Sequence, residues 1–382
     1  MAYSTSAPCG PFRYPAEKII AYATSANEGK TKPHPMYAGY DAACTRTTSI
    51  AQHSWLMAAL CFALPPHIED SELDISHCIQ LSVVYGMMEL NEELCRGNSA
   101  EGLSKELKEG KTLASQIVLE VDKIAMSLLA PREIRSQSVV WLQDWAEEIL
   151  RKFPINQDSN GMAGSSKSVD WSVQWQLQER CLPCPRDHEK SLAVFARIAA
   201  YLPSVPRQGW LDNDIPKPES VADHSWLMAV LCFLLSDDGT VNIKHAVRGC
   251  VVHDIAESLV GDITYQDEIR REEKLARESH TIDFLQSQLP NHSPLKSSWD
   301  EFERGETLTD EIAKDLDRVD LGLQALIYER EEGKKLEEFF HSASRVKTCP
   351  GLVEEIKAKR EIEGAGTLDP TKEQKLNEYY GE

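Results

Sequence analysis

The sequence predicts an all-α protein built from two copies of one helical bundle, of which the first copy is degenerate. Apolar residues recur at helical spacing through most of the 382 residues, and the period-2 alternation typical of strands is nearly absent. The two halves also share a long repeat. Residues 49–64 read SIAQHSWLMAALCFAL, residues 220–235 read SVADHSWLMAVLCFLL, and 12 of these 16 positions are identical without a gap. Such a match indicates a tandem duplication.

Changes in composition along the chain predict the domain boundaries. Residues 1–35 are rich in Gly, Pro, Ser and Thr, and we expect a poorly ordered lead-in. Residues 36–153 are expected to form the first helical domain. Residues 155–168 hold turn formers and almost no apolar anchors, which predicts a linker, expected over residues 154–180. The second domain is expected over residues 181–365, followed by a polar, frayed tail at residues 366–382.

Composition also excludes several classes of function. The formal charge of −20 argues against binding a nucleic-acid polymer or an anionic membrane, because both reward clustered Lys and Arg. The longest apolar run, residues 227–235, is far too short for a membrane span, and the N-terminus lacks the layout of a signal peptide. We therefore expect a soluble cytoplasmic protein, with the nucleus as the alternative compartment, in which cysteines within apolar helical patterns are free thiols.

The second half contains a group of residues of the kinds that bind metals. Around position 253 the chain reads VVHDIAESLVGDI. At about 100° per residue, the aliphatic side chains gather on one side of a helix and His253, Asp254 and Glu257 on the other. An isolated His-Asp pair is usually part of a solvated helix face. Here, however, two further ligand-type residues accompany the pair.

These two residues are His224 and Asp317. His224 lies in the apolar stripe of the repeated helix, where a histidine is more often a core residue than a ligand. Asp317 lies beside the apolar stripe of a later helix, and on spacing alone Asp320 is an equally good choice. Taken together with His253 and Asp254, they supply two imidazoles and two carboxylates from three helices. That set suits a divalent metal, whether Mn²⁺, Co²⁺, Mg²⁺, Fe²⁺ or Zn²⁺.

This order of residues resembles that of the HD-domain metal-dependent phosphohydrolases, and the fuller match is to their 5′-deoxynucleotidase branch. The matching motifs are VPRQGW (205–210), PESVADHSW (218–226), HDIAESLVGDIT (253–264), REEK (271–274) and LDRVD (316–320). The resemblance covers roughly residues 190–360. It implies an enzyme that removes the 5′-phosphate from deoxynucleoside monophosphates with a divalent metal ion.

The resemblance also implies a role for each site residue. The implied roles are metal ligands for His224, His253, Asp254 and Asp317, catalytic carboxylates for Glu257 and Asp262, and a catalytic, phosphate-binding arginine for Arg207. Glu257 would orient or deprotonate the attacking water. The forked donors of Arg207 suit a phosphoryl group.

The first half repeats these motifs in a decayed form. Tyr85 and Gly86 replace the His-Asp pair, Met36 is aligned with the arginine and Leu94 with Asp262. The retained or equivalent residues are His53, Glu89 and Asp122. Without the adjacent pair, this half is not expected to hold a catalytic metal. Because HD units often pair, the resemblance implies an intrachain pseudo-dimer, with a homodimer as the alternative.

Alternatives remain open from the sequence alone. Other HD chemistry is one, either hydrolysis of nucleotide phosphodiesters or di-iron oxygenation that would use His280 and His292, although both lie in polar surroundings. A nucleotide-binding regulatory pseudo-enzyme is another. Cys181 and Cys184 form a CxxC motif, but the chain has no second CxxC to complete a zinc site, and a functional role is disfavoured.

Overall fold

The computed structural model describes the larger part of the chain, in six segments. These are residues 8–35, 48–68, 71–129, 188–267, 269–361 and 368–380. The expected linker at 154–180, the CxxC cysteines Cys181 and Cys184, and Met36 lie outside the described residues.

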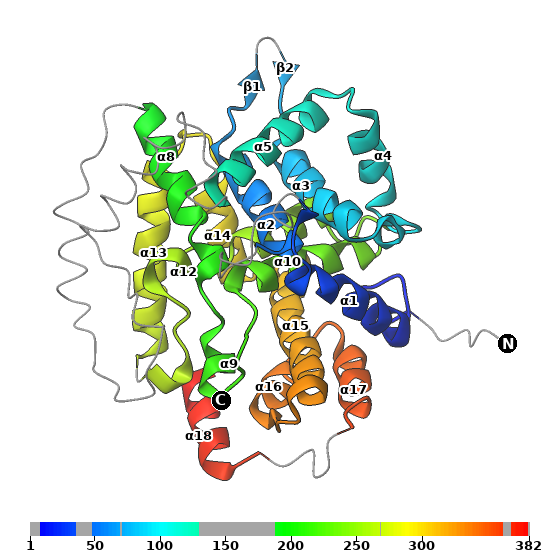
Figure 1. The fold of residues 1–382 in the computed structure, drawn as a ribbon. Coiled ribbons are helices and arrows are strands. Elements are labelled where there is room, and N and C mark those ends of the chain that lie inside the picture. The colour runs from blue at the N-terminus through cyan, green and yellow to red at the C-terminus, as the bar shows by residue number, and fades with distance from the viewer. Residues whose placement is uncertain are drawn as a thin grey trace, which may run out of the picture.

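The N-terminal half is helical apart from a minimal hairpin (Figure 1). Its helices are α1 (Ala16–Thr31), α2 (Ile50–Leu60), α3 (Ile75–Leu90), α4 (Glu101–Glu109) and α5 (Leu113–Leu129). Two short 3-10 turns, η2 (Cys61–Ala63) and η3 (Glu92–Cys95), follow α2 and α3. The strands β1 (His67–Ile68) and β2 (Ser71–Glu72) pair antiparallel.

The C-terminal half is also helical. Its helices are α8 (His188–Ala199), α9 (Gln208–Asp212), α10 (Val221–Leu231), α11 (Ile243–Val252), α12 (Glu257–Val260), α13 (Arg271–Ser287), α14 (Leu295–Arg304), α15 (Leu308–Glu332), α16 (Glu337–Ala343), α17 (Pro350–Ala358) and α18 (Pro370–Tyr380). The 3-10 turns are η5 (Leu202–Ser204), η6 (Cys232–Leu234) and η7 (Tyr265–Asp267). The all-α prediction is confirmed. No described helix is both long enough and apolar enough to cross a membrane.

The repeated sequence forms the same local structure twice. Ser49 caps α2 and Ser220 caps α10, and each serine forms a reciprocal capping box with the residue three positions later, Gln52 or Asp223. Each helix then ends in a 3-10 turn that begins at a cysteine. Because both helices are apolar on nearly all sides, each must be buried between other helices.

The two halves bury these helices against one another. The indole N–H of Trp55 donates to the carbonyl of Val251 at 3.1 Å, and the indole N–H of Trp226 donates to Ser54 Oγ at 2.9 Å. Both tryptophans are fully buried, and one continuous hydrophobic core spans the two halves. The halves are therefore parts of one packed body.

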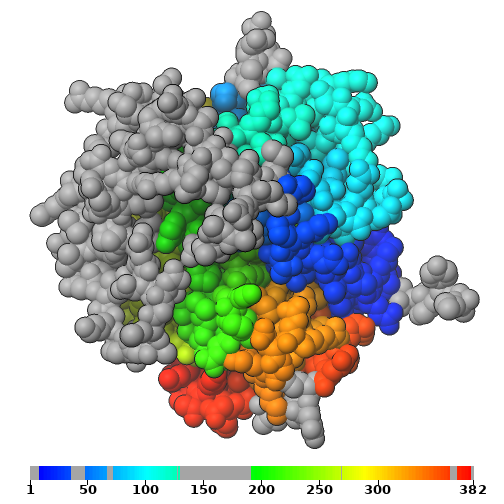
Figure 2. Space-filling model, viewed as in Figure 1, coloured from blue at the N-terminus to red at the C-terminus, as the bar shows by residue number. Residues whose placement is uncertain are grey.

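The expectation of a poorly ordered lead-in at residues 1–35 is wrong for residues 16–31. Residues 16–31 form α1, whose Ile19, Ala23 and Ala26 are buried. This helix contacts α2, α3, α10, α15 and α17. Figure 2 shows it, in blue, between the cyan and orange parts of the surface. Average composition concealed its apolar stripe, which recurs at helical spacing.

The frayed tail expected at residues 366–382 is also wrong, since residues 370–380 form α18. Leu376 is buried, and Lys372 forms an ion pair with Glu338 at 2.8 Å. Arg345 donates to Asn377 at 2.9 Å. The polar residues of this segment fold because α16 and the chain that follows it supply partners for them.

Two equivalent backbone bridges, one in each half, show which residues of the two repeats correspond. Pro33 forms an isolated bridge with Ser49, and Pro206 forms the equivalent bridge with Ser220. The residue after each proline donates its N–H across the bridge, to Thr48 in the first case and to Glu219 in the second. The structural counterpart of Arg207 is therefore His34. The alignment of Met36 with Arg207 is wrong, because it ignored this pairing.

The threonine caps of α5 and α15 give a second reference point for aligning the two repeats. Thr112 caps α5 and Thr307 caps α15, each by accepting a backbone N–H three residues later. Asp122 follows Thr112 by the same number of residues as Asp317 follows Thr307. The two aspartates are thus equivalent.

Candidate metal centre

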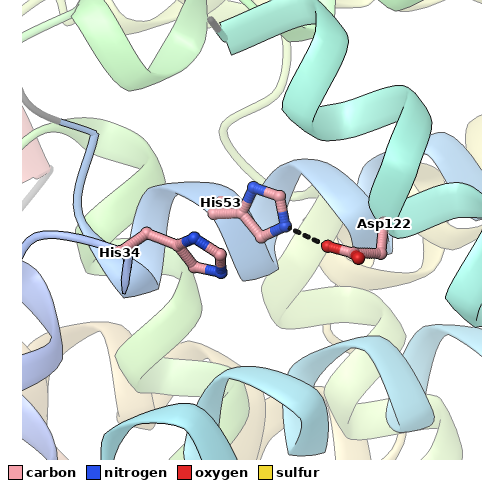
Figure 3. A group of neighbouring side chains, drawn as sticks. All are labelled: His34, His53 and Asp122. Carbon is pink, nitrogen blue, oxygen red and sulfur yellow. Dashed lines mark hydrogen bonds and ion pairs between the residues drawn. The ribbon is translucent and has the colours of Figure 1, made fainter. Parts of the chain in front are cut away.

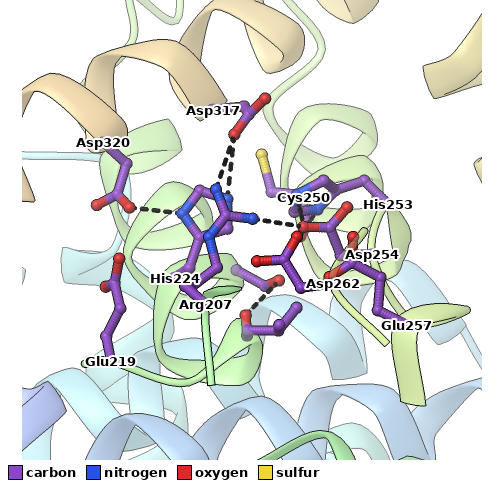
Figure 4. A network of polar contacts seen from close by, with 12 residues as sticks. Arg207, Glu219, His224, Cys250, His253, Asp254, Glu257, Asp262, Asp317 and Asp320 are labelled. Carbon is purple, nitrogen blue, oxygen red and sulfur yellow. Dashed lines mark hydrogen bonds and ion pairs between the residues drawn. The ribbon is translucent and has the colours of Figure 1, made fainter. Parts of the chain in front are cut away.

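Two buried histidines from different helices form the centre of the site (Figure 4). His224 lies on α10 and His253 directly follows α11, with their ring centroids 5.4 Å apart. The Nδ1 atom of His224 lies 2.6 Å from Asp320, and that of His253 lies 2.9 Å from the carbonyl oxygen of Cys250. Each Nδ1 therefore carries a proton and donates, which leaves each Nε2 as the atom that can bind a metal ion once it is deprotonated.

The two Nε2 atoms are buried and, within the described part of the chain, neither makes a hydrogen bond. A buried nitrogen without a hydrogen bond is costly unless something else binds it. Each lies near a carboxylate: His224 Nε2 is 3.2 Å from Asp317, and His253 Nε2 is 3.0 Å from Asp254. His224, His253 and Asp254 offer ligand atoms within 4.8 Å of one another. Two imidazoles beside two carboxylates fit a divalent transition metal.

Both carboxylates are held in the ionised form. Burial opposes the charge on Asp254, but His253 and Arg207 outweigh that effect and keep its pKa well below the usual range. Burial likewise opposes the charge on Asp317, and His224 and Arg207 outweigh it and lower its pKa. Ionised carboxylates are the form that binds metal ions.

Arg207 lies between the two carboxylates. It caps the N-terminus of α9, and its guanidinium is 3.2 Å from Asp254 and 3.9 Å from Asp317. Burial opposes its charge, but Asp262, Asp254 and the other surrounding carboxylates raise its pKa further above the usual value. Its planar donors are thus charged and point to the carboxylates that flank the histidines (Figure 4).

Glu257 begins α12 and is almost completely buried. Its Oε1 accepts from Lys274 at 3.2 Å, whereas its Oε2 has no hydrogen-bond partner among the described residues. Burial and the charges of Asp254 and Asp262 raise its pKa well above the usual range. A carboxylate with a raised pKa is suited to accepting a proton.

Asp262 has a different environment. Its Oδ2 accepts the backbone N–H of Gln208 at 2.7 Å, the residue that follows Arg207. This contact fixes the start of α9 and so helps to place the guanidinium.

The structure distinguishes Asp317 from Asp320, which the sequence left equivalent. Asp317 faces His224 Nε2, and Asp320 binds the opposite nitrogen. Asp320 is fully buried and also accepts from the ammonium group of Lys30 at 3.1 Å. Lys30 lies on α1 and also binds Glu219 at 2.5 Å. The ammonium group thus occupies the Glu219–His224–Asp320 cluster, which makes that cluster a poor metal site.

The sequence reasoning did not identify Lys30, which contacts Asp320, or Lys274, which contacts Glu257. Lys274 belongs to the REEK motif, which was a usable signal. Lys30 carried no signal, because it lies in a segment that was expected to be poorly ordered.

The histidines that a di-iron oxygenase would require lie outside the centre. His280 is exposed on α13 and contacts the carbonyl of Ala276, one turn earlier. His292 is exposed after α13 and contacts the carbonyl of Leu64 at 3.2 Å. Neither belongs to a candidate metal cluster of the described residues.

Comparison with known proteins gives a consistent family. The family described as HD domain matches residues 39–93 and 199–356. The 5′-deoxynucleotidase HDDC2 of Xenopus laevis is 36% identical over 173 residues, which are 44% of this chain and 86% of that protein. Human 5′-deoxynucleotidase HDDC2 is 36% identical over 178 residues, 45% of this chain and 87% of that protein. The 5′-deoxynucleotidase hdd1 of Schizosaccharomyces pombe is 36% identical over 149 residues, 37% of this chain and 75% of that protein.

Proposed function

The chain belongs to the HD-domain family, and on this premise we propose that it is a metal-dependent 5′-nucleotidase that removes phosphate from deoxynucleoside 5′-monophosphates. The observation that carries the proposal is the pair of buried Nε2 atoms, on His224 and His253, that face ionised carboxylates instead of hydrogen-bond donors. The names of the relatives support the substrate class.

In this proposal His224, His253, Asp254 and Asp317 hold the divalent metal ion. When bound, the ion lowers the pKa of its water and neutralises phosphoryl oxygens. Asp320 and the carbonyl of Cys250 hold the two imidazoles in the tautomer that exposes Nε2. These contacts fix the ligands before substrate arrives.

Arg207, Glu257 and Asp262 carry out the remaining steps. Arg207 binds the phosphoryl oxygens and offsets their charge in the transition state. Glu257 orients the attacking water with its free Oε2 and accepts a proton from it, while Lys274 holds the other oxygen. Asp262 positions Arg207 through the backbone of Gln208.

Phosphate release from a panel of deoxy- and ribonucleoside 5′-monophosphates tests the proposal. Chelator-stripped protein is assayed alone and after addition of Mn²⁺, Co²⁺, Mg²⁺, Fe²⁺ or Zn²⁺. We expect turnover only with added metal and faster turnover on the deoxynucleotides. Folded, metal-loaded protein that releases no phosphate from any of these substrates would contradict the proposal.

We further infer that the two halves form an intrachain pseudo-dimer in which the degenerate half stands in for a second protomer. The reciprocal contacts of Trp55 and Trp226 support this arrangement, as does the reach of Lys30 from α1 to Asp320. Light scattering is expected to find one chain per particle, and a two-chain particle would favour the homodimer.

Truncation provides a second test of the pseudo-dimer. A chain that begins at residue 188 lacks the apolar surfaces that cover α10 and α11. We expect it to aggregate and to release no phosphate. A soluble fragment with full turnover would show that the degenerate half is dispensable.

A further inference from the structure

The degenerate half contains a second cluster of metal-binding residue types (Figure 3). His34, His53 and Asp122 offer ligand atoms that all lie within 4.8 Å of one another. His53 Nε2 is 2.7 Å from Asp122, and the rings of His34 and His53 have centroids 4.2 Å apart. The cluster is separate from the catalytic centre and shares no residue with it.

Three different segments bring these side chains together. His34 follows α1 and is fixed by its backbone N–H, which donates to Thr48 at 3.0 Å. His53 lies on α2 and Asp122 on α5. His34 and His53 are buried, and the Asp122 side chain is 14% exposed. Buried groups from separate segments are preorganised, because each is held by the packing of its own element.

The register of the repeat assigns each of these residues a counterpart in the catalytic centre. The pairs are His53 with His224, Asp122 with Asp317, and His34 with Arg207. Two of the three residues are thus the same type in both halves. The third replaces an arginine, which cannot bind a metal ion, with an imidazole, which can. The degenerate half therefore lost the His-Asp pair but gained one nitrogen donor.

We propose that His34, His53 and Asp122 form a binding site for a divalent transition metal ion of the zinc type. Two imidazole nitrogens and one carboxylate oxygen are a common protein ligand set for such an ion and leave a position for water. Tyr85 stands where the catalytic half has His253, and its ring centroid lies 6.4 Å from that of His53.

The role of this ion is structural. It joins the segment after α1 to α2 and α5, and binding to the folded form alone adds to the stability of this half. Phosphate hydrolysis is not expected here, because Gly86 supplies no carboxylate and His34 has replaced the phosphate-binding arginine.

The experiment counts zinc ions per chain in the full-length protein. The His253→Ala/Asp254→Ala variant removes one imidazole and one carboxylate from the first site and leaves only His224 and Asp317 of the proposed ligands there, so the remaining zinc reports on the second site. Chelator-stripped protein is equilibrated with Zn²⁺, freed of excess ion, and measured by elemental mass spectrometry and by thermal unfolding. We expect this variant to retain one zinc and to unfold at a higher temperature when zinc is present.

Adding His34→Ala to this background is expected to remove the zinc and the thermal shift. The control is His77→Ala, which removes another histidine of the same half that pairs with Glu106 at 2.9 Å outside the cluster. The control should retain both signals. His34→Cys, which supplies a thiolate ligand, should retain the zinc.

Two outcomes would overturn the proposal. One is that the His253→Ala/Asp254→Ala variant holds no zinc after excess ion is removed. The other is that the same variant with His34→Ala added holds as much zinc as its parent. His34 lies outside the helices, so its replacement leaves a folded protein to measure even if variants of the fully buried His53 aggregate. The zinc count does not depend on phosphate release, so the second-site proposal can fail or succeed separately from the proposed function.

Discussion

The first helix of the central pair, α2 or α10, is alike in the two halves. The second helix, α3 or α11, differs in where it ends. In the degenerate half α3 runs unbroken from Ile75 to Leu90. In the other half α11 ends at Val252, the chain turns, and α12 begins at Glu257. Between α11 and α12 the backbone follows a tighter pattern, with N–H groups donating three residues back, as Glu257 does to Asp254 at 3.0 Å. The break in the helix lets His253 and Asp254 contact one another beside His224.

Packing prevents the degenerate half from regaining the pair. Gly86 occupies the position of Asp254, and a Cβ atom there would lie 2.5 Å from the Cβ of Ser54. Ser54 in turn accepts the indole N–H of Trp226 from the other half. The degenerate half therefore gave up a carboxylate at a point where close packing now joins the halves.

The degenerate half supports the catalytic half in return. Lys30 donates to Asp320, and Asp320 accepts from His224. Burial opposes the charge of Lys30, but Asp320 and Glu219 outweigh it and raise its pKa. In the proposed function, one half thus holds the reacting groups, and the other supplies a cation that orients one of them. Four predictions test this division.

The largest effect is expected for Asp254→Ala. Loss of a metal ligand should lower phosphate release by at least about 10⁴-fold, equivalent to about 5.5 kcal/mol of transition-state stabilisation. Steady-state rates at saturating metal measure the effect. Thermal unfolding checks that the variant is folded. If the folded variant retained more than a tenth of the wild-type rate, the catalytic centre would have to lie elsewhere.

Lys30→Met should have the next largest effect. Removing the cation leaves Glu219 buried without a counter-charge among the described residues and leaves Asp320 paired with His224 alone, which costs about 3–5 kcal/mol in free energy of unfolding. Because Asp320 orients His224, metal affinity should also fall by about 10- to 100-fold. Urea unfolding and metal titration measure the two effects.

Lys32→Met is the matched control, since Lys32 is exposed and, among the described residues, its ammonium contacts only the carbonyl of Leu90 at 3.4 Å. It should leave both quantities near wild-type values. Equal metal affinity in Lys30→Met and Lys32→Met would exclude the positioning role of Lys30.

The two halves should differ in how their histidines respond to pH in metal-free protein. Burial and Arg207 oppose protonation of His224, but Asp317 and Asp320 outweigh them and raise its pKa to about 9. Its contribution to stability is therefore full below about pH 6.5 and is lost as pH rises through about 9. Burial, followed by the neighbouring His53, lowers the pKa of His34 to about 4, although Asp122 opposes this. Its contribution is full above about pH 6.5 and is lost as pH falls towards about 4.

Each contribution is about 3 kcal/mol at most. Urea unfolding from pH 4.5 to 9 should give a maximum near pH 6.5. His224→Gln should flatten the alkaline side, and His34→Gln the acidic side. Unchanged profiles in both variants would show that other groups control the pH dependence.

The smallest effect is expected for a pair of glycines on equivalent helices. Gly86→Ala forces a methyl group against Ser54 and should destabilise the protein by about 1–3 kcal/mol. Gly249→Ala places its methyl group 3.5 Å from Phe302, an ordinary contact, and should stabilise α11 by about 0.5–1 kcal/mol. Urea unfolding of the two variants should therefore give shifts of opposite sign. The same sign for both would contradict the close packing at Gly86.

The sequence by itself determined the helical class, the repeat and the set of residues that the structure brings together at the metal centre. Helical periodicity depends on residues a few positions apart, so residues 49–64 and 220–235 could be recognised as equivalent helical segments without a structure. The spacing of His224, the His253–Asp254 pair and the LDRVD motif was likewise visible along the chain.

Only the tertiary structure decided which side of a residue faces which partner. It placed Asp317 and Asp320 on opposite nitrogens of His224, brought Lys30 from α1 to Asp320, and put His34 beside His53. These contacts join segments that are distant in sequence or separated by a turn, and they depend on how the helices pack. A local pattern cannot encode such contacts, because the same stretch of helix could present either face until its neighbours are in place.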